Sequence, residues 1–272
     1  MTHILEELET ITKALGDLLL AWRTQGFTQG NWEGSQLKAD ADRRAHDFLV
    51  KQLQRAGPGI PIISEEDSST QGALRPNEYW LIDPIDGTAS FCNDFDGFVT
   101  QVALMRACQP ILAVVHAPAL RLTYTASLDG PALRNALPIS TVASGTRAPI
   151  LIDNYPEPRG IAREVYDAIG CGGYVESGSI GLKICRVADG TADLFVKDVV
   201  VRDWDLAPAD LILARAGGLL HTLAGNSLPY HGRFEHAGLI AIGDGALMNR
   251  VSTWNANRPN QQHATSNEHK QA

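Results

Sequence analysis

The first part of the chain shows helical periodicity. Apolar side chains recur every three or four positions from Ile4 to Trp22, which is the spacing of one face of a helix. Several of the intervening side chains are acidic, whereas a helix lying on a membrane surface favours Lys and Arg on its polar face. We therefore expect this helix to pack on a protein core. A second helix is predicted from Asp42 to Arg55, and it should end near the turn residues 57–59.

Short apolar runs bounded by turn residues predict strands in the next part of the chain. These strands are expected at residues 61–64, 79–82, 98–104, 111–115 and 122–126. The second half alternates helices with strands. Helices are predicted from Ile180 to Ala188 and from beside Asp205 to Ala216, and strands at 192–196, 219–223 and 239–242. The pattern as a whole indicates a mixed fold of helices and strands.

These elements divide into two halves followed by a tail. Residues 1–145 are expected to form an N-terminal α+β half, and residues 146–254 a C-terminal α/β half. Residues 255–272 are rich in Asn, Gln and His, so we expect them to form a disordered tail. The chain has 272 residues, of which 44% are hydrophobic, and this is enough for a substantial core.

Charge and cysteine content exclude several classes of protein. The formal net charge is −8 and there is no run of Lys or Arg, so the chain is not expected to bind nucleic acid. No apolar run approaches about 18 residues and no signal segment opens the chain, so no membrane association is expected. The four cysteines lack the C-x-x-C spacing of zinc and redox sites. We therefore predict reduced thiols and a cytoplasmic protein.

The most informative local segment is 83–88, Asp-Pro-Ile-Asp-Gly-Thr, which follows an apolar strand. Pro84 fixes one backbone dihedral and Gly87 permits an unusual one, so two carboxylates and a backbone carbonyl can converge. Oxygen ligands of this kind suit a hard cation such as Mg²⁺. The amides of Gly87 and Thr88 could also bind a phosphate. The same residues form ordinary turns elsewhere, whereas the ligand spacing of an EF-hand is missing.

Three further acidic segments have plainer interpretations when taken singly. Residues 64–67, Ser-Glu-Glu-Asp, are typical of a solvated loop at the end of a strand. Asp205 precedes an apolar helix and could serve only as its N-cap. Residues 40–46 are typical of the charged start of a helix. An assignment of chemistry therefore depends on the four segments together.

Together these segments resemble the inositol monophosphatase family, the lithium-sensitive, magnesium-dependent phosphatases that include the bisphosphate nucleotidases. Residues 80–88 are similar to the family signature W-x-I/V-D-P-I/L-D-G-T, and residues 204–218 to W-D-x-A-x-x-x-L-I-x-x-x-x-G-G. Glu65-Glu66 and the helix start 42–46 match the family's acidic pair and its D-x-x-x-H/E helix. The likeness runs in order over roughly residues 1–250. It implies an α+β fold, a layered α/β/α/β/α sandwich.

The resemblance also implies which residues carry the chemistry. The implied metal ligands are four carboxylates and one backbone carbonyl, from Glu65, Asp83, Asp86, Asp205 and Ile85. Asp83 would bridge two ions. Asp42 and Thr88 would hold and activate the attacking water, and a third ion would lie near Asp42 and Glu66. The loop before Asp42, which contains Lys38, looks shorter than in the family, so the sequence does not decide whether a third ion binds.

The implied substrate contacts are of two kinds. Gly87 and Thr88 would present backbone amides to the phosphate. The rest of the substrate would contact residues of the second half, namely Gly178, Ser179, Lys183 and Asp198. The expected cofactor is Mg²⁺, two or three ions per site, with Mn²⁺ as a substitute and Li⁺ and Ca²⁺ as inhibitors. Homodimers are common in the family, and one is compatible with this chain.

The identity of the substrate stays open at the level of sequence. Residues 64–67, 117–118, 207–208 and Lys183 look more like bisphosphate nucleotidases, whereas residues 83–86 and Asp198 look more like inositol phosphatases. We predict a 3′(2′),5′-bisphosphate nucleotide, with inositol-1-phosphate, sugar phosphates and histidinol phosphate as alternatives. Two alternatives of other classes are a non-catalytic metal-binding scaffold and a calcium-binding protein.

Overall fold

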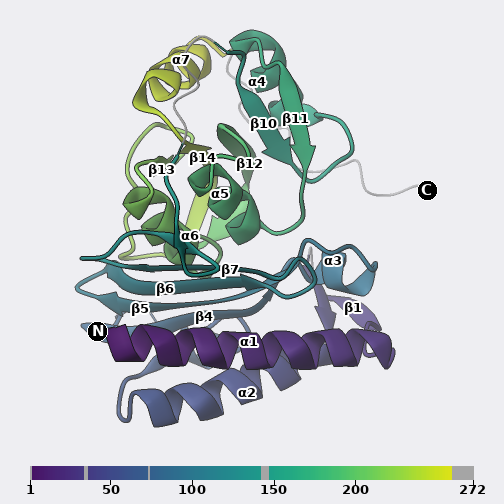
Figure 1. Cartoon of the computed structure of the whole chain (residues 1–272), viewed down its shortest axis with the longest axis vertical. Coiled ribbons are helices and arrows are strands. Elements are labelled where there is room, and N and C mark those ends of the chain that lie inside the picture. The colour runs from purple at the N-terminus through teal and green to yellow at the C-terminus, as the bar shows by residue number, and fades with distance from the viewer. Residues whose placement is uncertain (1, 34–35, 73, 142–146, 259–272) are drawn as a thin grey trace.

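The computed structural model describes residues 2–33, 36–72, 74–141 and 147–258. Their helices alternate with two large sheets in five layers (Figure 1). This arrangement is the α/β/α/β/α sandwich that the sequence resemblance predicts.

The first two layers are a helix pair and the larger sheet. Helices α1 (Thr2–Thr24) and α2 (Asp40–Ala56) cover one face of a seven-stranded sheet of order β3-β4-β5-β6-β7-β8-β9. Its strands are β3 (Ile62–Ser64), β4 (Glu78–Asp86), β5 (Val99–Arg106), β6 (Gln109–Ala117), β7 (Leu122–Ser127), β8 (Leu133–Arg134) and β9 (Leu137–Pro138). Apolar side chains of both layers, including Leu15, Leu49 and Trp80, form one buried core.

The third and fourth layers are a second helix pair and the smaller sheet. Helices α5 (Ile180–Ala188) and α6 (Asp203–Arg215) lie between the two sheets, and their core includes side chains from both, such as Tyr124 and Phe195. The five-stranded sheet has the order β11-β10-β12-β14-β13. Its strands are β10 (Ile150–Asp153), β11 (Gly173–Glu176), β12 (Leu194–Arg202), β13 (Leu219–His221) and β14 (Glu235–Ile242).

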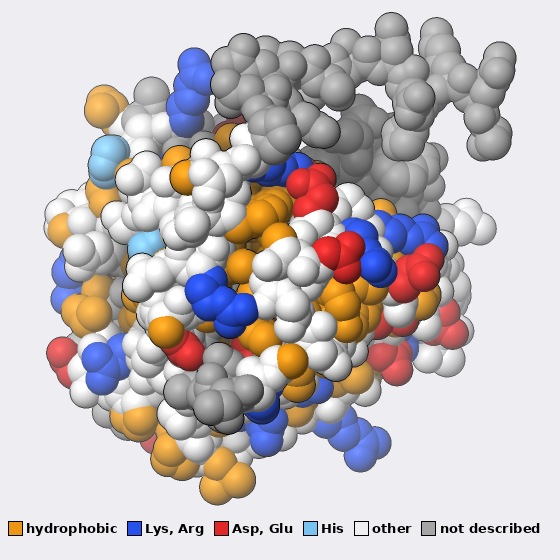
Figure 2. All heavy atoms as spheres, turned by 90° about the horizontal axis from the view of Figure 1, so that it is seen from above, with side chains coloured by type: hydrophobic (Ala, Val, Ile, Leu, Met, Phe, Trp, Pro, Cys, Tyr) orange, Lys and Arg blue, Asp and Glu red, His pale blue; other side chains and the backbone are white. Residues whose placement is uncertain are grey.

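The fifth layer consists of α4 (Gly160–Ile169) and α7 (Gly245–Ala256), which cover the outer face of the smaller sheet. Figure 2 shows this side of the molecule, where side chains of both charge signs are interspersed with apolar ones. The described residues on this face therefore present no extended basic surface. Among the residues that the structure describes, no helix is both long and apolar enough to cross a membrane.

The sequence prediction of the C-terminus needs one correction. The disordered tail was predicted from residue 255, but Asn255 and Ala256 belong to α7. Asn255 is held there because its Nδ2 donates a hydrogen bond to the carbonyl of Leu223 (2.6 Å). Residues 259–272 lie outside the described residues.

Several elements had no counterpart in the sequence prediction. They include the hairpin of β1 (Gly30–Glu33) and β2 (Gln36–Ala39), the short helices η1 (Ser68–Thr70) and α3 (Thr88–Cys92), and the succession β10–α4–β11. These elements are short, and short segments carry little periodic signal.

Candidate active site

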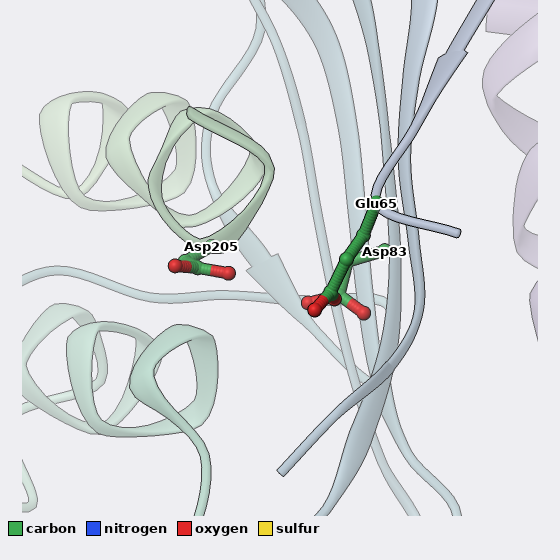
Figure 3. A group of neighbouring side chains, drawn as sticks. All are labelled: Glu65, Asp83 and Asp205. Atoms are coloured by element: carbon green, nitrogen blue, oxygen red, sulfur yellow. The ribbon is translucent and has the colours of Figure 1, made fainter. Parts of the chain in front are cut away.

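The ends of two parallel strands bring the first two carboxylates together. β3 and β4 are parallel, and Ser64 pairs with Ile82. The amide of Glu65 donates to the carbonyl of Ile82 (3.3 Å), which continues the pairing by one residue. Paired residues of neighbouring strands point to the same face of a sheet, so Glu65 and Asp83 emerge side by side. Figure 3 shows their carboxylates next to each other.

A third carboxylate comes from helix α6. This helix begins at Asp203 with Arg202 as N-cap, so Asp205 is its third residue and not its N-cap. Asp205 Oδ2 accepts a hydrogen bond from the amide of Arg202 (2.7 Å), as the third residue of a capping box does. Figure 3 shows that the carboxylate of Asp205, on its helix, faces those of Glu65 and Asp83 at the sheet. One oxygen of each carboxylate lies within 4.8 Å of the other two.

A β-bulge at the end of β4 shapes the loop that follows. The register between β4 and β5 shifts between Asp83 and Asp86. Pro84 lies within this irregular stretch, where its missing N–H is tolerated. Gly87 then adopts φ +89°, a left-handed conformation that favours glycine, and it caps the start of α3. The chain therefore turns at Gly87, within the segment for which the sequence predicts contact with a phosphate.

Asp86 lies beside the group of three carboxylates, and hydrogen-bond donors hold it. Its Oδ2 accepts from the amide of Gly181 (2.8 Å) and from Gln101 Nε2 (3.3 Å). Its Oδ1 accepts from the amide of Ile180 (3.4 Å). Asp86 therefore links the end of β4 to the first turn of α5, and it is not a member of the group whose oxygens lie within 4.8 Å.

The two residues predicted to activate water are in contact. Asp42 is in the first turn of α2 and is only 2% exposed. The hydroxyl of Thr88 lies 3.1 Å from Asp42 Oδ1 and 3.2 Å from the carbonyl of Ile85, both of which can accept its hydrogen. The structure therefore joins Asp42 to the loop that carries Asp83 and Asp86.

Burial and mutual repulsion raise the pKa values of the clustered carboxyls. Burial raises the pKa of Asp83 well above its usual value, and the carboxylates of Glu65, Asp86 and Asp205 raise it further. Burial also raises the pKa of Asp205 well above its usual value, with Glu65 and Asp86 adding to the effect. The pKa of Asp86 rises to about 6, chiefly through burial, although the hydrogen bond from Gly181 opposes the rise. A divalent cation would neutralise this concentration of negative charge.

The donor set fits such a cation. Asp83 Oδ1 accepts a hydrogen bond from the amide of Ile85 (3.1 Å), but its Oδ2 is buried without a hydrogen-bond partner among the described residues. A buried acceptor of this kind is satisfied when it ligates a cation. Carboxylate oxygens without His or Cys favour hard ions such as Mg²⁺, Mn²⁺ or Ca²⁺.

Two predicted substrate residues, Gly178 and Ser179, lie against the loop of Gly87. A Cβ on Gly87 would lie 3.2 Å from Ser179 Cβ. The amide of Ser179 donates to the carbonyl of Gly97 (2.6 Å). A Cβ on Gly178 would lie 2.2 Å from the same carbonyl oxygen, so only glycine fits there. Loops from the two sheets therefore meet beside the carboxylates.

Lys183 lies between two layers, and its predicted contact with the substrate stays a prediction. Lys183 has no exposed surface, and its Nζ donates to the carbonyl of Gly178 and to Asn154 Oδ1. Burial lowers its pKa to about 7. The Lys183 side chain therefore holds the backbone at Gly178 through a buried hydrogen bond. Sequence could not show this, because helix α5 places the residue between two layers.

Asp198 also lies apart from the clustered carboxylates. It stands where the register of β12 and β14 shifts, between Lys197 and Val200. Its carboxylate is 3.9 Å from the guanidinium of Arg258, and 43% of its side chain is exposed. The structure therefore pairs Asp198 with Arg258, which follows α7, and its predicted contact with substrate stays a prediction.

Two glutamines that sequence analysis missed support the site. Gln71 Nε2 donates to the carbonyls of Ser64 (2.8 Å) and Glu65 (3.2 Å) and so holds the segment that carries the Glu65 carboxylate. Gln101 is fully buried and donates to Asp86. Gln101 could have been noticed from sequence, because it is a polar residue inside the apolar run 98–104. Nothing in the loop around Gln71 indicated that it holds the backbone of the Glu65 segment.

A buried polar network surrounds Asp203, two residues before Asp205 in the first turn of α6, and it was not predicted from sequence. The guanidinium of Arg75 pairs with Asp203, and His236 Nε2 lies 2.6 Å from the other oxygen of Asp203. Arg75 also packs on the ring of Phe234, with 3.9 Å from its Cζ to the ring centroid. The network fastens the loop before β4 to the first turn of α6.

Comparisons with known proteins identify a family and several relatives of this chain. A family model described as the inositol monophosphatase family matches residues 2–262. The chain is 30% identical over 253 residues to a 3′(2′),5′-bisphosphate nucleotidase CysQ of Aggregatibacter actinomycetemcomitans, covering 85% of this chain and 89% of that protein. It is 33% identical over 199 residues to a protein of the same name from Buchnera aphidicola, covering 70% of this chain and 73% of that protein.

Solved structures share the fold. An IMPase of Thermotoga maritima superposes with a TM-score of 0.79 at 21% identity, covering 94% of this chain and 97% of that one. The extragenic suppressor protein suhB of Bartonella henselae superposes with a TM-score of 0.80 at 19% identity, covering 94% of this chain and 100% of that one. These similarities confirm the predicted layered sandwich.

Proposed function

Because this chain belongs to the inositol monophosphatase family, we propose that it removes one phosphate from a 3′(2′),5′-bisphosphate nucleotide, with Mg²⁺ as cofactor. The family consists of metal-dependent phosphatases, so the chain is a phosphoric monoester hydrolase. One observation carries the proposal: oxygens of Glu65, Asp83 and Asp205 converge within 4.8 Å, and Asp83 Oδ2 is buried without a described partner. Repelling carboxylates of this kind are stable together when they share cations.

The choice of substrate rests on the curated relatives. The proteins to which this chain is 30% and 33% identical over most of its length are both named 3′(2′),5′-bisphosphate nucleotidase. This favours a bisphosphate nucleotide over inositol-1-phosphate, a sugar phosphate or histidinol phosphate.

The proposed cation ligands are Glu65, Asp83, Asp86, Asp205 and the carbonyl of Ile85. Bound cations would supply the positive charge that orients the phosphate and lowers the pKa of water. A third ion would take Asp42 and Glu66 as ligands. We expect Mn²⁺ to substitute for Mg²⁺, and we expect Li⁺ and Ca²⁺ to inhibit.

The chain's own groups handle the proton and the substrate. Thr88 Oγ1 would accept a proton from the attacking water while its own hydrogen passes to Asp42 Oδ1, 3.1 Å away. The amides of Gly87 and Thr88 would donate to the phosphate oxygens. Ser179, which lies against Gly87, and Gly178, which lies against Gly97, would contact the alcohol that leaves.

A phosphate-release assay tests the proposal. Purified protein is supplied with adenosine 3′,5′-bisphosphate, inositol-1-phosphate, a sugar phosphate or histidinol phosphate, with Mg²⁺ or with EDTA. We expect the highest kcat/KM on the bisphosphate and no turnover in EDTA. No turnover on any ester would favour a non-catalytic scaffold. Activation by Ca²⁺ but not by Mg²⁺ would contradict the cofactor assignment.

Compartment and assembly complete the proposal. We place the reaction in the cytoplasm, because all four cysteines are free thiols, as expected where glutathione keeps thiols reduced. We also propose a homodimer, following the pattern of the family, and sedimentation of the purified protein would test it.

A further inference from the structure

The second sheet presents two loops at the edge that faces the carboxylates. β10 runs parallel to both β11 and β12, and Asp153 pairs with Glu176 at the ends of β10 and β11. The amide of Ser177 donates to the carbonyl of Asp153 (2.8 Å), so the two chains leave the sheet together. In α/β sheets, ligands bind at the carboxyl ends of parallel strands. The loop after β10, residues 154–159, is therefore placed to take part in binding.

This loop adjoins the phosphate-binding segment through one buried lysine. Lys183 Nζ donates both to Asn154 Oδ1 and to the carbonyl of Gly178. The residue after Gly178, Ser179, lies against Gly87. Tyr155, which follows Asn154, therefore belongs to the loop that Lys183 connects to the segment of Gly178 and Ser179.

Tyr155 has the features of a ligand platform and not those of a core residue. It is 43% exposed, although the hydroxyl of Tyr174 fixes its backbone by donating to its carbonyl (2.7 Å). The guanidinium carbon of Arg159 lies 5.0 Å from the centroid of the Tyr155 ring. An exposed ring beside a guanidinium offers two flat surfaces on which a nucleobase can stack.

The charge of Arg159 is free to meet an anion. Its one ion pair among the described residues, with Glu157, is long at 3.5 Å, and the two side chains are 58% and 72% exposed, so the pair is weak. Lys197 also lies near the ring, with its Nζ 5.8 Å from the centroid. Lys197 is engaged with the buried carboxylate of Asp153 at 3.0 Å, so it contributes less to an added anion.

We propose that Tyr155 and Arg159 form a subsite for the part of the substrate that is not hydrolysed: the base stacks on Tyr155, and Arg159 binds the second phosphate. This inference rests on the proposed function and names the residues that select a nucleotide carrying two phosphates. Arg159 is suited to the phosphate because its planar fork can donate two parallel hydrogen bonds.

Steady-state kinetics on three substrates test the subsite. Adenosine 3′,5′-bisphosphate has the base and both phosphates, 3′-AMP lacks the 5′-phosphate, and glycerol 2-phosphate lacks the base as well. We expect R159Q to raise KM about tenfold for the bisphosphate and to leave 3′-AMP within twofold. We expect Y155L to raise KM about tenfold for both nucleotides and to leave glycerol 2-phosphate unchanged.

Helix α4 offers a matched control. Arg163 lies over Tyr166 at 5.9 Å and pairs with Asp167, on a surface exposed to a similar degree. R163Q should leave all three KM values unchanged, and thermal melting would show that every variant is folded. An inhibition assay adds a second readout, in which 5′-AMP competes with glycerol 2-phosphate and its inhibition constant should rise about tenfold in R159Q.

The outcomes distinguish a failure of the proposed subsite from a failure of the proposed function. Wild-type turnover of the bisphosphate with unchanged KM in R159Q and Y155L would overturn the subsite and leave the proposed function standing. A KM that rises equally for all three substrates would also overturn it, because the variants would then have disturbed the hydrolytic centre. If the wild-type protein did not turn over the bisphosphate, both the subsite and the proposed function would be overturned.

Discussion

Asp83 is the residue on which the proposed chemistry depends most. It is 1% exposed, one of its oxygens has no described partner, and Glu65, Asp86 and Asp205 all raise its pKa. D83N keeps the shape of the side chain and removes one repelling charge. We expect kcat to fall on the order of 100-fold or more, since the loss of a single charge-stabilising group in other sites costs this much. The melting temperature in EDTA should stay the same or rise. Activity like that of the wild type would contradict the role.

Thr88 allows a matched test of the proton path. Its hydroxyl contacts Asp42 at 3.1 Å, and only this hydroxyl is needed in the proposed transfer. T88A should lower kcat by roughly 10²- to 10⁴-fold, which is the usual contribution of general acid–base catalysis. T88S keeps the hydroxyl and should retain most of the activity. Equal kcat values for the two variants would show that the hydroxyl carries no proton.

At the scale of elements, periodicity predicted which segments form helices and strands, but not which of these elements contact one another. Helices α1 and α2 appear as expected, since each buries one apolar stripe against the larger sheet, and α6 appears where an apolar segment is buried between the two sheets. The parallel pairing of β3 with β4 places Glu65 beside Asp83, and no local pattern in a three-residue strand could show it. The metal ligands were predicted because their motifs resemble a family. Arg75 and Asp203 were missed because they are 128 positions apart and belong to no such motif.

The network of Arg75 gives a prediction for helix α6. Asp203 is fully buried and only 3% of the Arg75 side chain is exposed. Removing one partner leaves a buried charge, so R75M should lower the free energy of unfolding by about 3–5 kcal/mol, measured by urea denaturation. R106Q removes an exposed partner of Glu78, and it should cost less than about 1 kcal/mol. Equal losses in the two variants would mean that the network does not fasten α6.

At the scale of the whole molecule, the site forms where the two sheets' loops meet. Gly97 and Gly178 touch backbone to backbone, and a Cβ on Gly178 would lie 2.2 Å from the carbonyl oxygen of Gly97. G178A should therefore separate the loops and lower kcat/KM at least about tenfold, since small misplacements at an active site are costly. G245A is the control, because a Cβ there meets no atom within 4 Å. Full activity of G178A would show that the contact is not needed.

The carboxylate cluster also couples the stability of the whole protein to pH and metal. The pKa of Asp86 rises to about 6 on folding, and those of Asp83 and Asp205 rise as well. Between about pH 4, where carboxyls of an unfolded chain titrate, and pH 6, the folded protein holds more protons than the unfolded one. The contribution of these groups to stability therefore falls as the pH rises through this window.

Mg²⁺ reverses this loss, because it competes with the protons and binds the ionised carboxylates of the folded chain alone. Adding Mg²⁺ should hence raise the melting temperature little at pH 5 and several degrees at pH 7.5, and the rise should shrink in D83N. Melting curves in EDTA and in Mg²⁺ at the two pH values measure it. An equal rise at both pH values, or a full rise in D83N, would mean that the ion stabilises the protein somewhere other than at this cluster.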